Sequence, residues 1–512
     1  MAVSAARLRR AVRRETFGVD VGGALNLVGA MVRYMSLAFL LPIGFAIGYD
    51  ESAWPFILAA ALTASAGWTL ERFTHGKEAI GPREGFLVVS LAWLLGALVI
   101  SLPYLIGEPQ LRSPIDAYFE AMSGMTTTGA SVLTDIPALD HSMAMWRQFS
   151  QWLGGMGIIV LALAVLPRLR VGGRQLMEFE APGPELEPLG ASIRDTARRL
   201  WLLYVGITAL MIATLTAFAW TGIDERMSPY EAIAHAFTTL PTGGFSTRAR
   251  SIEEFGAASQ WAIGVFMVIA GANFALMYRA FIRRRPKAAI RDEELRLYLG
   301  LLALASIVLF LDIVQEGIQG GEAAIRHAFF QASSIMTTTG YASVDFVADW
   351  TSLAAIVLVA LMFIGGSAGS TGGAIKPVRI LLVARVLRRE LDHTVHPELV
   401  SPIRFNGTVV NERTLRAVVA FVVLYVLIFA LGALIIAIDS GRADLNVGAF
   451  DAIAASATTI GNVGPGFGFA GPMGSFEPFS PLSKGVMIVL MWMGRLELIP
   501  IAVLLTKNYW RA

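Results

Sequence analysis

The chain has 512 residues, of which 55% are hydrophobic and 16% are charged, whereas soluble proteins average about 25% charged residues. Its formal net charge of +2 gives no indication of a nucleic-acid partner, and its lack of cysteine excludes a disulfide framework and cysteine-ligated iron–sulfur centres. The apolar residues fall into blocks of about 20, the length needed to cross a hydrocarbon core of about 30 Å. The composition therefore predicts a multi-pass membrane protein.

An Arg-rich N-terminus leads into the first apolar block, and no small-residue cleavage site follows it. We therefore interpret this block as a retained helix and not as a signal peptide. Ten blocks are long enough to span a membrane: 23–48, 55–71, 85–107, 142–167, 198–221, 258–282, 296–315, 350–375, 412–438 and 481–508. Four shorter apolar segments are better suited to re-entrant helices: 114–127, 229–241, 323–338 and 448–460.

The positive charges support this topology. Six polar segments, all on one side of the predicted membrane, contain 31 of the 41 Lys and Arg residues. The positive-inside rule places these segments in the cytoplasm. They are 1–22, 72–84, 168–199, 279–296, 376–416 and 507–512. We therefore expect both termini to be cytoplasmic.

A repeated motif follows the four short segments. Each segment runs into a Thr-x-Gly sequence, and the four copies are Thr127, Thr128, Gly129; Thr242, Gly243, Gly244; Thr338, Thr339, Gly340; and Thr459, Ile460, Gly461. One copy alone would be an ordinary turn after a helix, where glycine is common. Four copies in the same context instead predict four internal repeats, 81–172, 173–290, 291–400 and 401–512, preceded by a two-helix hairpin over 1–80.

Such loops are suited to conducting a monovalent cation. An ion that leaves water needs substitute oxygens, and four converging loops can provide rings of backbone carbonyls together with threonine hydroxyls. Glycine permits the positive φ that turns successive carbonyls inward. The C-terminal ends of the short helices, each equivalent to roughly −0.5 charge, would favour a cation on the axis. We therefore predict a pore for a monovalent cation.

Four further strings carry a family resemblance: Gln-Trp-Leu-Gly-Gly-Met-Gly-Ile at 151–158, Ala-Gly-Ala-Asn-Phe-Ala at 270–275, Gly-Gly-Ser-Ala-Gly-Ser-Thr-Gly-Gly at 365–373 and Gly-Arg-Leu-Glu-Leu at 494–498. With the four loops, they make the chain resemble the Trk/Ktr/HKT superfamily of potassium transporters over nearly its whole length. The two leading helices resemble the TrkH type, because Ktr-type subunits lack them.

The resemblance implies an all-α polytopic membrane protein. Four pseudo-symmetric repeats, each a helix, a pore helix, a filter loop and a second helix, would surround one central pore, with the N-terminal hairpin outside them. The transported ion would be K⁺, held by the twelve Thr-x-Gly residues and principally by Thr127 with Thr128, Thr242 with Gly243, Thr338 with Thr339, and Thr459 with Ile460. Gly129 favours potassium, since a serine there accompanies sodium permeation in plant relatives. The fourth loop departs most from the others, so the symmetry should be approximate.

The resemblance also implies partners and a location. A cytoplasmic RCK (TrkA-type) nucleotide-binding regulatory subunit would dock on 168–199, 279–296 and the basic segment that begins at Lys376 and Arg379. Alternatively, the side chains of Lys376 and Arg379 could simply reach lipid phosphates. TrkH-type proteins are homodimers in the prokaryotic cell (inner) membrane, and we expect the lipid bilayer but no nucleic acid as a further partner.

One predicted span contains a stretch poor in helix-forming residues. Seven of its nine residues are Gly or Ser: Gly365, Gly366, Ser367, Ala368, Gly369, Ser370, Thr371, Gly372 and Gly373. Such a run should either unwind into a loop or form a small-residue packing face, because its glycines also have GxxxG spacing. The residues alone leave both open. The family resemblance favours the loop, acting as an intramembrane gate.

Arg495 lies near the middle of the last predicted span. A cation there costs roughly 2.5–3.5 kcal/mol on insertion scales, so its side chain should face the protein interior. Glu497 is a poor partner for it, because residues two apart on a helix point to different faces. The resemblance implies that Arg495 lies below the filter against the gating loop as an electrostatic barrier.

Other functions are less consistent with the sequence. The six histidines show no metal-binding spacing and no GxSxG motif is present, so we expect neither an enzyme nor a bound organic cofactor. A secondary transporter with inverted repeats conflicts with repeats that all run the same way. A pump-associated KdpA-like subunit and a less selective Na⁺/K⁺ conductor stay as alternatives, and the choice between channel and ion-coupled symporter stays open.

Overall fold

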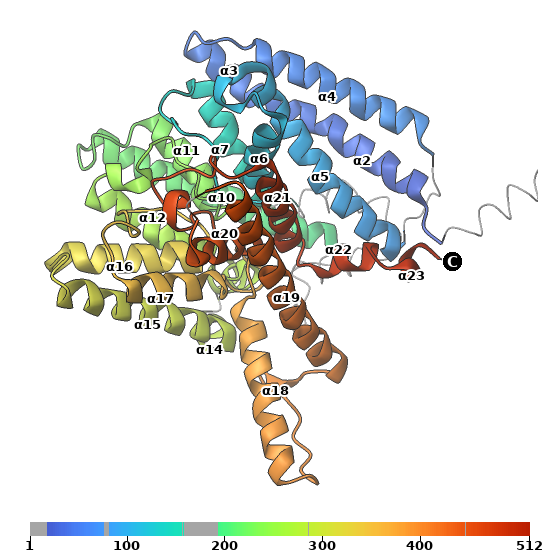
Figure 1. Ribbon diagram of the computed structural model, residues 1–512, viewed down its shortest axis with the longest axis vertical. Coiled ribbons are helices and arrows are strands. Elements are labelled where there is room, and N and C mark those ends of the chain that lie inside the picture. The colour runs from blue at the N-terminus through green and yellow to red at the C-terminus, as the bar shows by residue number, and fades with distance from the viewer. Residues whose placement is uncertain are drawn as a thin grey trace, which may run out of the picture.

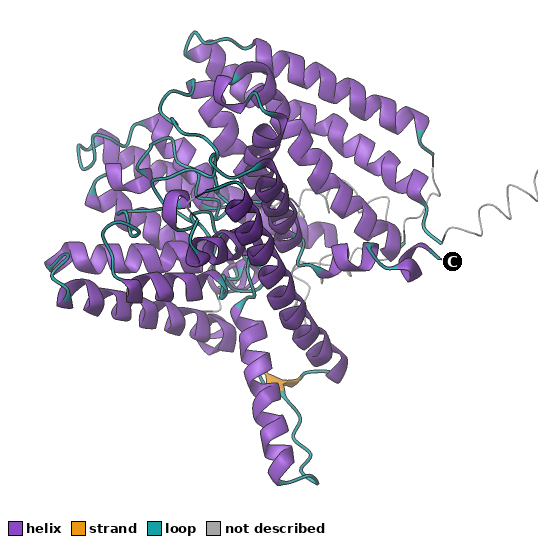
Figure 2. Ribbon diagram, viewed as in Figure 1, coloured by secondary structure: helices purple, strands orange, loops and turns teal. Residues whose placement is uncertain are grey.

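The computed structural model describes residues 18–75, 81–155, 157, 193–284, 286–445 and 447–511. In this part of the chain the fold is almost entirely helical (Figure 2), apart from one hairpin in which Arg404–Phe405 (β1) pairs with Thr408–Val409 (β2). The all-α prediction is confirmed. The second part of the predicted span 142–167 and most of the predicted docking segment 168–199 lie outside the described residues.

The N-terminal hairpin consists of two packed arms. The first is α2 (Val21–Met35), η1 (Ser36–Phe39) and α3 (Leu40–Gly48), and the second is α4 (Trp54–Phe73). The Asn26 side-chain amide donates hydrogen bonds to the carbonyls of Glu71 (2.7 Å) and Thr74 (2.9 Å), which ties the arms together. Figure 1 shows the hairpin lying along the outside of α5.

Four similar units follow the hairpin. The first contains α5 (Pro82–Gly107), η2 (Pro109–Leu111), α6 (Pro114–Met125) and α7 (His141–Gly155). The second contains α10 (Ile193–Trp220), α11 (Pro229–Thr239), η3 (Ser251–Glu254), α12 (Ala257–Ala270), α13 (Phe274–Met277) and η4 (Tyr278–Ile282). Proline at the first position starts both α6 and α11, where its missing N–H costs nothing.

The third unit contains α14 (Pro286–Arg291), α15 (Glu293–Gln315), α16 (Gly321–Met336), α17 (Ser352–Met362) and α18 (Pro377–Val395). The fourth contains α19 (Glu412–Arg442), α20 (Ala449–Gly461), η5 (Gly468–Ala470), α21 (Pro481–Arg495), α22 (Ile499–Leu504) and α23 (Lys507–Trp510). The short helices α6, α11, α16 and α20 match the four predicted re-entrant segments.

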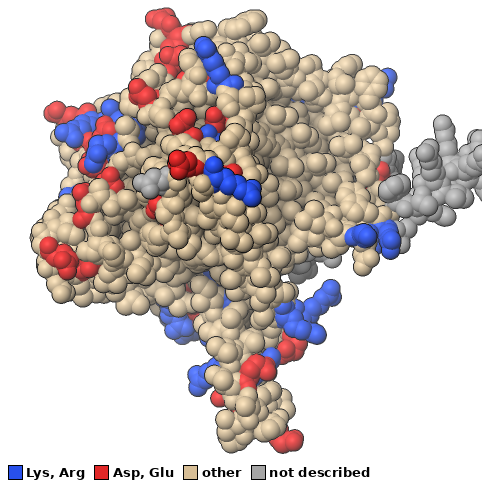
Figure 3. Space-filling view, viewed as in Figure 1, with Lys and Arg blue, Asp and Glu red and all other residues tan. Residues whose placement is uncertain are grey.

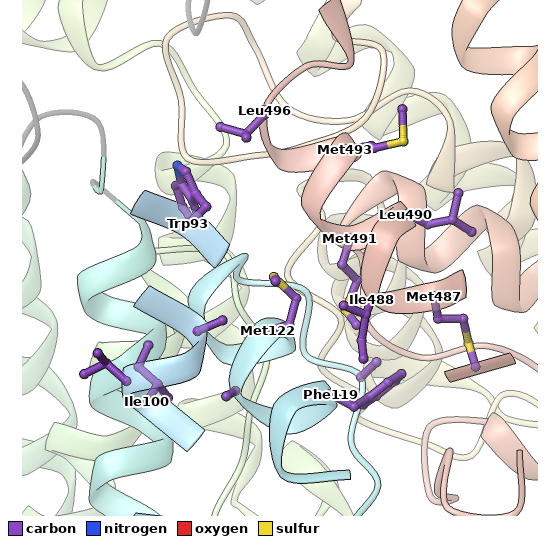
Figure 4. Close-up of a cluster of buried hydrophobic side chains, with 14 of the residues drawn as sticks. Trp93, Ile100, Phe119, Met122, Met487, Ile488, Leu490, Met491, Met493 and Leu496 are labelled. Carbon is purple, nitrogen blue, oxygen red and sulfur yellow. The ribbon is translucent and has the colours of Figure 1, made fainter. Parts of the chain in front are cut away.

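The units are arranged in a ring. Within each unit the short helix packs on the helix before it, and the helix after it packs on the short helix of another unit: α7 on α11, α12 on α16, α17 on α20 and α21 on α6. The last contact closes the ring. Figure 4 shows this closing seam, where Trp93 and Ile100 of α5, Phe119 and Met122 of α6 and the side chains of α21 lie together in one buried cluster.

Fewer continuous spans are present than predicted. In the described part of the chain, five helices are long and apolar enough to cross a membrane, or six if α12 and the helix that follows it count as one bent span. None of the predicted spans 258–282, 350–375 and 481–508 is a continuous helix, and only the break in 350–375 was expected, from its Gly- and Ser-rich stretch. The first bends by 98° after Ala270, the second stops at Met362, and the third stops at Arg495. The first two breaks lie at glycine-containing stretches of low helix propensity.

The surface is consistent with a membrane protein. On the face shown in Figure 3, charged side chains gather in patches, one of them along α18, and a broad uncharged area lies between them. Large apolar side chains such as Leu304, Leu311 and Leu427 are exposed on the long helices α15 and α19, as expected for helices that face lipid. Helix α18 projects away from the helical body (Figure 1).

Candidate ion pathway

The four short helices all end in the same backbone turn. The residue at the turn has a left-handed conformation and donates its N–H to the carbonyl three residues earlier, while the next residue donates to the carbonyl five residues earlier. The turn residues are Thr127 (φ 53°), Thr242 (φ 57°), Thr338 (φ 61°) and Asn462 (φ 54°). We call the segments that begin at these residues filter strands 1 to 4.

A glycine with positive φ stands two residues after each turn residue, and these glycines close a ring. A β-carbon placed on Gly129 would lie 2.2 Å from the carbonyl oxygen of Gly243 in strand 2. The corresponding distances are 1.9 Å from Gly244 to Thr339, 1.9 Å from Gly340 to Val463 and 2.8 Å from Gly464 to Thr128. Each strand therefore lies against the next, strand 4 lies against strand 1, and no side chain fits at these four positions.

The fourth strand begins three residues later than the sequence motif suggests. Ile460 and Gly461 belong to the end of α20, and a β-carbon on Gly461 would meet the Met362 carbonyl, not a neighbouring strand. Asn462, Val463 and Gly464 take the places that Thr127, Thr128 and Gly129 hold in strand 1. The Thr-x-Gly sequence at 459–461 therefore does not mark the fourth strand. Asparagine tolerates the left-handed conformation well, so the Asn-x-Gly sequence that follows was the better signal.

Polar side chains behind the strands hold strand 2 in place. Gln151 of α7 donates from Nε2 to the Gly243 carbonyl (2.7 Å) and accepts from the Phe245 N–H (3.1 Å). The buried pair of Arg147 Nε and Glu120 Oε1 (2.6 Å) lies nearby, and Arg147 also donates to the Ser246 carbonyl (3.0 Å). Gln151 opens the string 151–158 that carries the family resemblance, but no role could be assigned to any of these residues from the sequence, because helical spacing alone does not show that α7 faces strand 2.

The other strands have different supports. Glu120 accepts from the Val132 N–H (2.9 Å) behind strand 1, and Gln331 accepts from the Ser343 N–H (3.3 Å) behind strand 3. The Tyr341 hydroxyl contacts the Thr238 hydroxyl and donates to the His235 carbonyl (3.3 Å), which joins strand 3 to α11. Different polar side chains therefore support each of these filter strands.

The Gly- and Ser-rich stretch 365–373 is a loop directly against the filter strands. Helix α17 ends at Met362, and α18 begins only at Pro377. The Gly373 N–H donates to Thr338 Oγ1 (2.9 Å), and the Thr371 hydroxyl donates to the carbonyl of Leu240 (3.0 Å), which lies just before strand 2. These contacts exclude a continuous helix with a small-residue packing face.

The break in the second unit anchors this loop from the side. The Ser367 N–H donates to the Gly271 carbonyl (2.8 Å), and the Phe274 N–H donates to the Gly369 carbonyl (3.1 Å). On the other side, the buried carboxylate of Glu294 accepts from the N–H groups of Ala368 (2.7 Å) and Val378 (3.3 Å). Glu294 therefore holds the loop and the start of α18 together.

Arg495 contacts the loop, as the resemblance implied. Its Nη1 donates to the Thr371 carbonyl (2.7 Å), and its Nη2 lies 3.1 Å from the carbonyls of Gly154 and Gly155 at the end of α7. The guanidinium also lies 5.7 Å from the Trp93 ring. The positive charge thus bridges the fourth unit, the loop and the first unit.

Lys376 and Arg379 are buried, which rules out the alternative that they reach lipid phosphates and also the expectation that a partner docks directly on these two side chains. Both bind Glu497: Lys376 Nζ lies 2.5 Å from Glu497 Oε1, and Arg379 contacts Oε2. Glu497 and Leu498 have positive φ (57° and 59°), which breaks the chain between α21 and α22 and turns this carboxylate inward. A charged cluster of three residues therefore joins α18 to the segment that follows Arg495.

The chemistry of the ring suits a cation. In the described part of the chain, Thr127 Oγ1 and Asn462 Oδ1 are buried oxygens without a hydrogen-bond partner, and such groups are costly unless something else satisfies them. The ring also brings backbone carbonyls of all four strands close together, and backbone carbonyls are the ligands that replace the hydration shell of an ion in selectivity filters.

Comparisons with known proteins agree with this arrangement. A family model described as "Cation transport protein" (TrkH) matches residues 54–511. The Trk system potassium uptake protein TrkH of Escherichia coli K12 is 36% identical over 497 residues, covering 95% of this chain and 98% of that protein. The Vibrio parahaemolyticus protein of the same name is 37% identical, covering 95% and 99%.

A solved structure is similar over the same extent. The crystal structure of the potassium transporter TrkH from Vibrio parahaemolyticus has a TM-score of 0.83 and 34% sequence identity, covering 96% of this chain and 99% of that one. The family model, the relatives and the shared fold all span nearly the whole sequence. The chain therefore belongs to the TrkH family of cation transport proteins.

Proposed function

We propose that this protein takes up potassium across the cell membrane through the ring of filter strands. The observation that carries this proposal is the closed contact of the four strands, each glycine lying against the carbonyl of the next strand. A closed ring of backbone oxygens is what a dehydrated monovalent cation requires. The potassium-uptake names of the relatives support the same ion.

The ion-binding residues proposed here follow the structural register. Strands 1 to 3 contribute Thr127, Thr128, Gly129, Thr242, Gly243, Gly244, Thr338, Thr339 and Gly340, as predicted from the sequence. Strand 4 contributes Asn462, Val463 and Gly464 in place of Thr459, Ile460 and Gly461. The backbone carbonyls supply most of the ligands, with Thr127 Oγ1 as a side-chain oxygen that has no other partner among the described residues.

The loop 365–373 and Arg495 form the gate of this pathway. The loop bonds to strand 3 through Gly373 and lies against the end of α11, so an ion leaving the filter meets it. Arg495 adds a positive charge at the same level, which opposes the passage of a cation. Opening requires the loop to leave Thr338 and Arg495 to release the Thr371 carbonyl.

The further partners are also proposals. A cytoplasmic RCK/TrkA-type nucleotide-binding subunit would act on α18, which projects from the body and exposes Leu387, Leu391 and Val395. Its movement would reach the gate through the buried contacts of Lys376 and Arg379. The protein would be a homodimer in the prokaryotic inner membrane, with both termini in the cytoplasm, as the distribution of Lys and Arg indicates.

Ion flux into proteoliposomes tests the central proposal. K⁺, Rb⁺, Na⁺ and Li⁺ uptake should be compared for the wild type, Gly129→Ser and Gly300→Ser, with and without a nucleotide-loaded regulatory subunit. Gly300 is a matched control, since a β-carbon there meets nothing within 4 Å. Gly129→Ser should raise the Na⁺/K⁺ flux ratio and Gly300→Ser should not. If no alkali cation enters under any condition, the proposal is wrong.

A further inference from the structure

The turn residues of the four filter strands use their side chains in different ways. The Thr242 hydroxyl donates to the carbonyl of Pro241, the residue just before its strand, and Thr338 Oγ1 accepts from the Gly373 N–H of the loop. Thr127 Oγ1 has no partner among the described residues. Of these four equivalent side chains, Asn462 is the one that bonds to the neighbouring strand: its Nδ2 donates to Thr128 Oγ1 of strand 1 (3.0 Å).

The orientation of the Asn462 amide is determined by a second contact. The same Nδ2 lies 2.9 Å from the carbonyl oxygen of Met491 in α21. A backbone carbonyl accepts hydrogen bonds and cannot donate them, so the NH₂ group must face it. Oδ1 therefore points the other way, where it is buried without a partner among the described residues.

The hydroxyls of Thr128 and of Thr126, which lies just before strand 1, extend this contact into a chain of hydrogen bonds. The Thr126 hydroxyl donates to the Met122 carbonyl (2.7 Å), so its oxygen accepts from the Thr128 hydroxyl (2.7 Å). The Thr128 oxygen in turn accepts from Asn462. Every proton direction is thus fixed, from the amide of strand 4 through two hydroxyls to a carbonyl in the last turn of α6. Such chains strengthen each member.

The free side of the amide lies beside the gate. A β-carbon placed on Gly373 of the loop would be 3.2 Å from Asn462 Oδ1, and one placed on Gly494, next to Arg495, would be 2.9 Å from it. Asn462 is fully buried, so the amide fills the space where strand 4, strand 1, α21 and the loop meet.

We propose that Asn462 is a specificity-determining positioning residue, whose amide fixes the distance between strands 4 and 1 at the inner end of the filter. This inference rests on the proposed function. Selection of K⁺ over the smaller Na⁺ requires that ligand oxygens do not collapse inward around the smaller ion. The Asn462 amide opposes that collapse between strands 4 and 1, because it is hydrogen-bonded both to Thr128 of strand 1 and to Met491 of α21. Without it, Na⁺ should be coordinated more readily.

The test replaces each end of the contact separately. Asn462→Thr fits the backbone, since threonine occupies the same left-handed position in the other three strands, but its side chain is too short to bridge to both Thr128 and Met491. Thr128→Val removes the acceptor hydroxyl and keeps the side-chain shape. Asn26→Asp is the matched control, because Asn26 also donates to two backbone carbonyls, though in the N-terminal hairpin.

Na⁺ and K⁺ fluxes should be measured in proteoliposomes for all variants and for the double variant. Asn462→Thr and Thr128→Val, the two pore variants, should each raise the Na⁺/K⁺ flux ratio about fivefold. That is the factor that corresponds to the free energy of one typical hydrogen bond. The double variant should show little further change, because both substitutions break one contact. Asn26→Asp should leave the ratio as in the wild type. Since either pore variant alone tests the contact, misfolding of one leaves the other informative.

Two results would overturn the inference: an unchanged Na⁺/K⁺ flux ratio in a folded Asn462→Thr or Thr128→Val protein, whether or not both fluxes change together, or additive effects on that ratio in the double variant. A wild type that passes Na⁺ and K⁺ equally would also overturn it while leaving cation conduction intact. A wild type that passes no alkali cation would instead contradict the proposed function itself.

Discussion

Lys376 and Glu497 form a buried ion pair that joins the start of α18 to the chain after α21, with 2.5 Å between Lys376 Nζ and Glu497 Oε1. Lys376 is the residue before α18, and Glu497 follows Arg495 by two residues. Arg379 binds the other oxygen of the same carboxylate and lies 3.8 Å from the Phe421 ring. These contacts therefore form one junction between α18 and the segment that follows Arg495.

Glu497→Gln should destabilise the protein markedly. It leaves Lys376 and Arg379 buried without a counter-charge, and breaking a buried pair in this way costs about 3–5 kcal/mol. Thermal unfolding in detergent measures the effect. Glu412→Gln is the matched control, because Glu412 pairs with Arg389 at a side-chain exposure of 58%, where a pair contributes about 1 kcal/mol or less. Equal melting temperatures for the two variants would contradict the junction.

Arg495→Ala should raise the K⁺ flux. The substitution removes a positive charge that contacts both the loop and α7, and a fall in the barrier of roughly 1.4 kcal/mol would increase flux about tenfold. Arg495→Lys should keep the positive charge but lose the several N–H donors of the guanidinium. Its K⁺ flux should therefore lie between those of the wild type and Arg495→Ala. Flux that is unchanged or lower in folded Arg495→Ala protein would count against the barrier.

The sequence predicted the repeated architecture well, because each repeat carries local signals. The short helices at 114–127 and 229–241 begin at Ser-Pro pairs and end at glycine-containing turns. These local signals were enough to predict that the segments are helices and where they lie. The ring, however, depends on contacts between residues far apart in the chain. The bond between Asn462 and Thr128 joins positions 334 residues apart, and no local pattern indicates it.

Two errors have a physical reason in common. The breaks after Ala270 and Arg495 lie inside runs that are apolar enough to be read as single spans, because hydropathy does not measure backbone conformation. Leu498 illustrates this: an apolar residue in a predicted helix, it has φ 59° because its neighbour Glu497 turns inward to two cations. A tertiary ion cluster, absent from any local window, overrides the helical preference there.

The contact between the N-terminal hairpin and the first repeat should depend on pH. Glu51 accepts from the backbone N–H groups of His141 (2.7 Å) and Ser142 (2.8 Å) at the start of α7. Burial raises the pKa of Glu51, but the hydrogen bonds from Ser142 and His141 outweigh it, so the pKa lies below its ordinary value. A lowered pKa stabilises the fold above the unfolded-state pKa, and this contribution is lost as the pH falls through the folded-state pKa.

Wild type and Glu51→Gln should therefore differ in melting temperature at neutral pH, with the wild type more stable. The difference should shrink as acid protonates Glu51. Asp50→Asn, one residue earlier in the same loop, serves as the control for charge removal. A difference that persists unchanged in acid would show that the carboxylate charge is not what matters.

The register of the fourth filter strand gives the sharpest test of the site. Gly464 (φ 115°) lies against the Thr128 carbonyl, whereas Gly461 lies at the end of α20 against the Met362 carbonyl. A serine at either glycine meets backbone at 2.8 Å, so both substitutions should lower the melting temperature. Gly464→Ser should in addition raise the Na⁺/K⁺ flux ratio, because it displaces a strand of the ring, whereas Gly461→Ser should leave the ratio as it is. If Gly461→Ser changed the flux ratio and Gly464→Ser did not, the fourth filter strand would instead be the Thr-x-Gly sequence at 459–461.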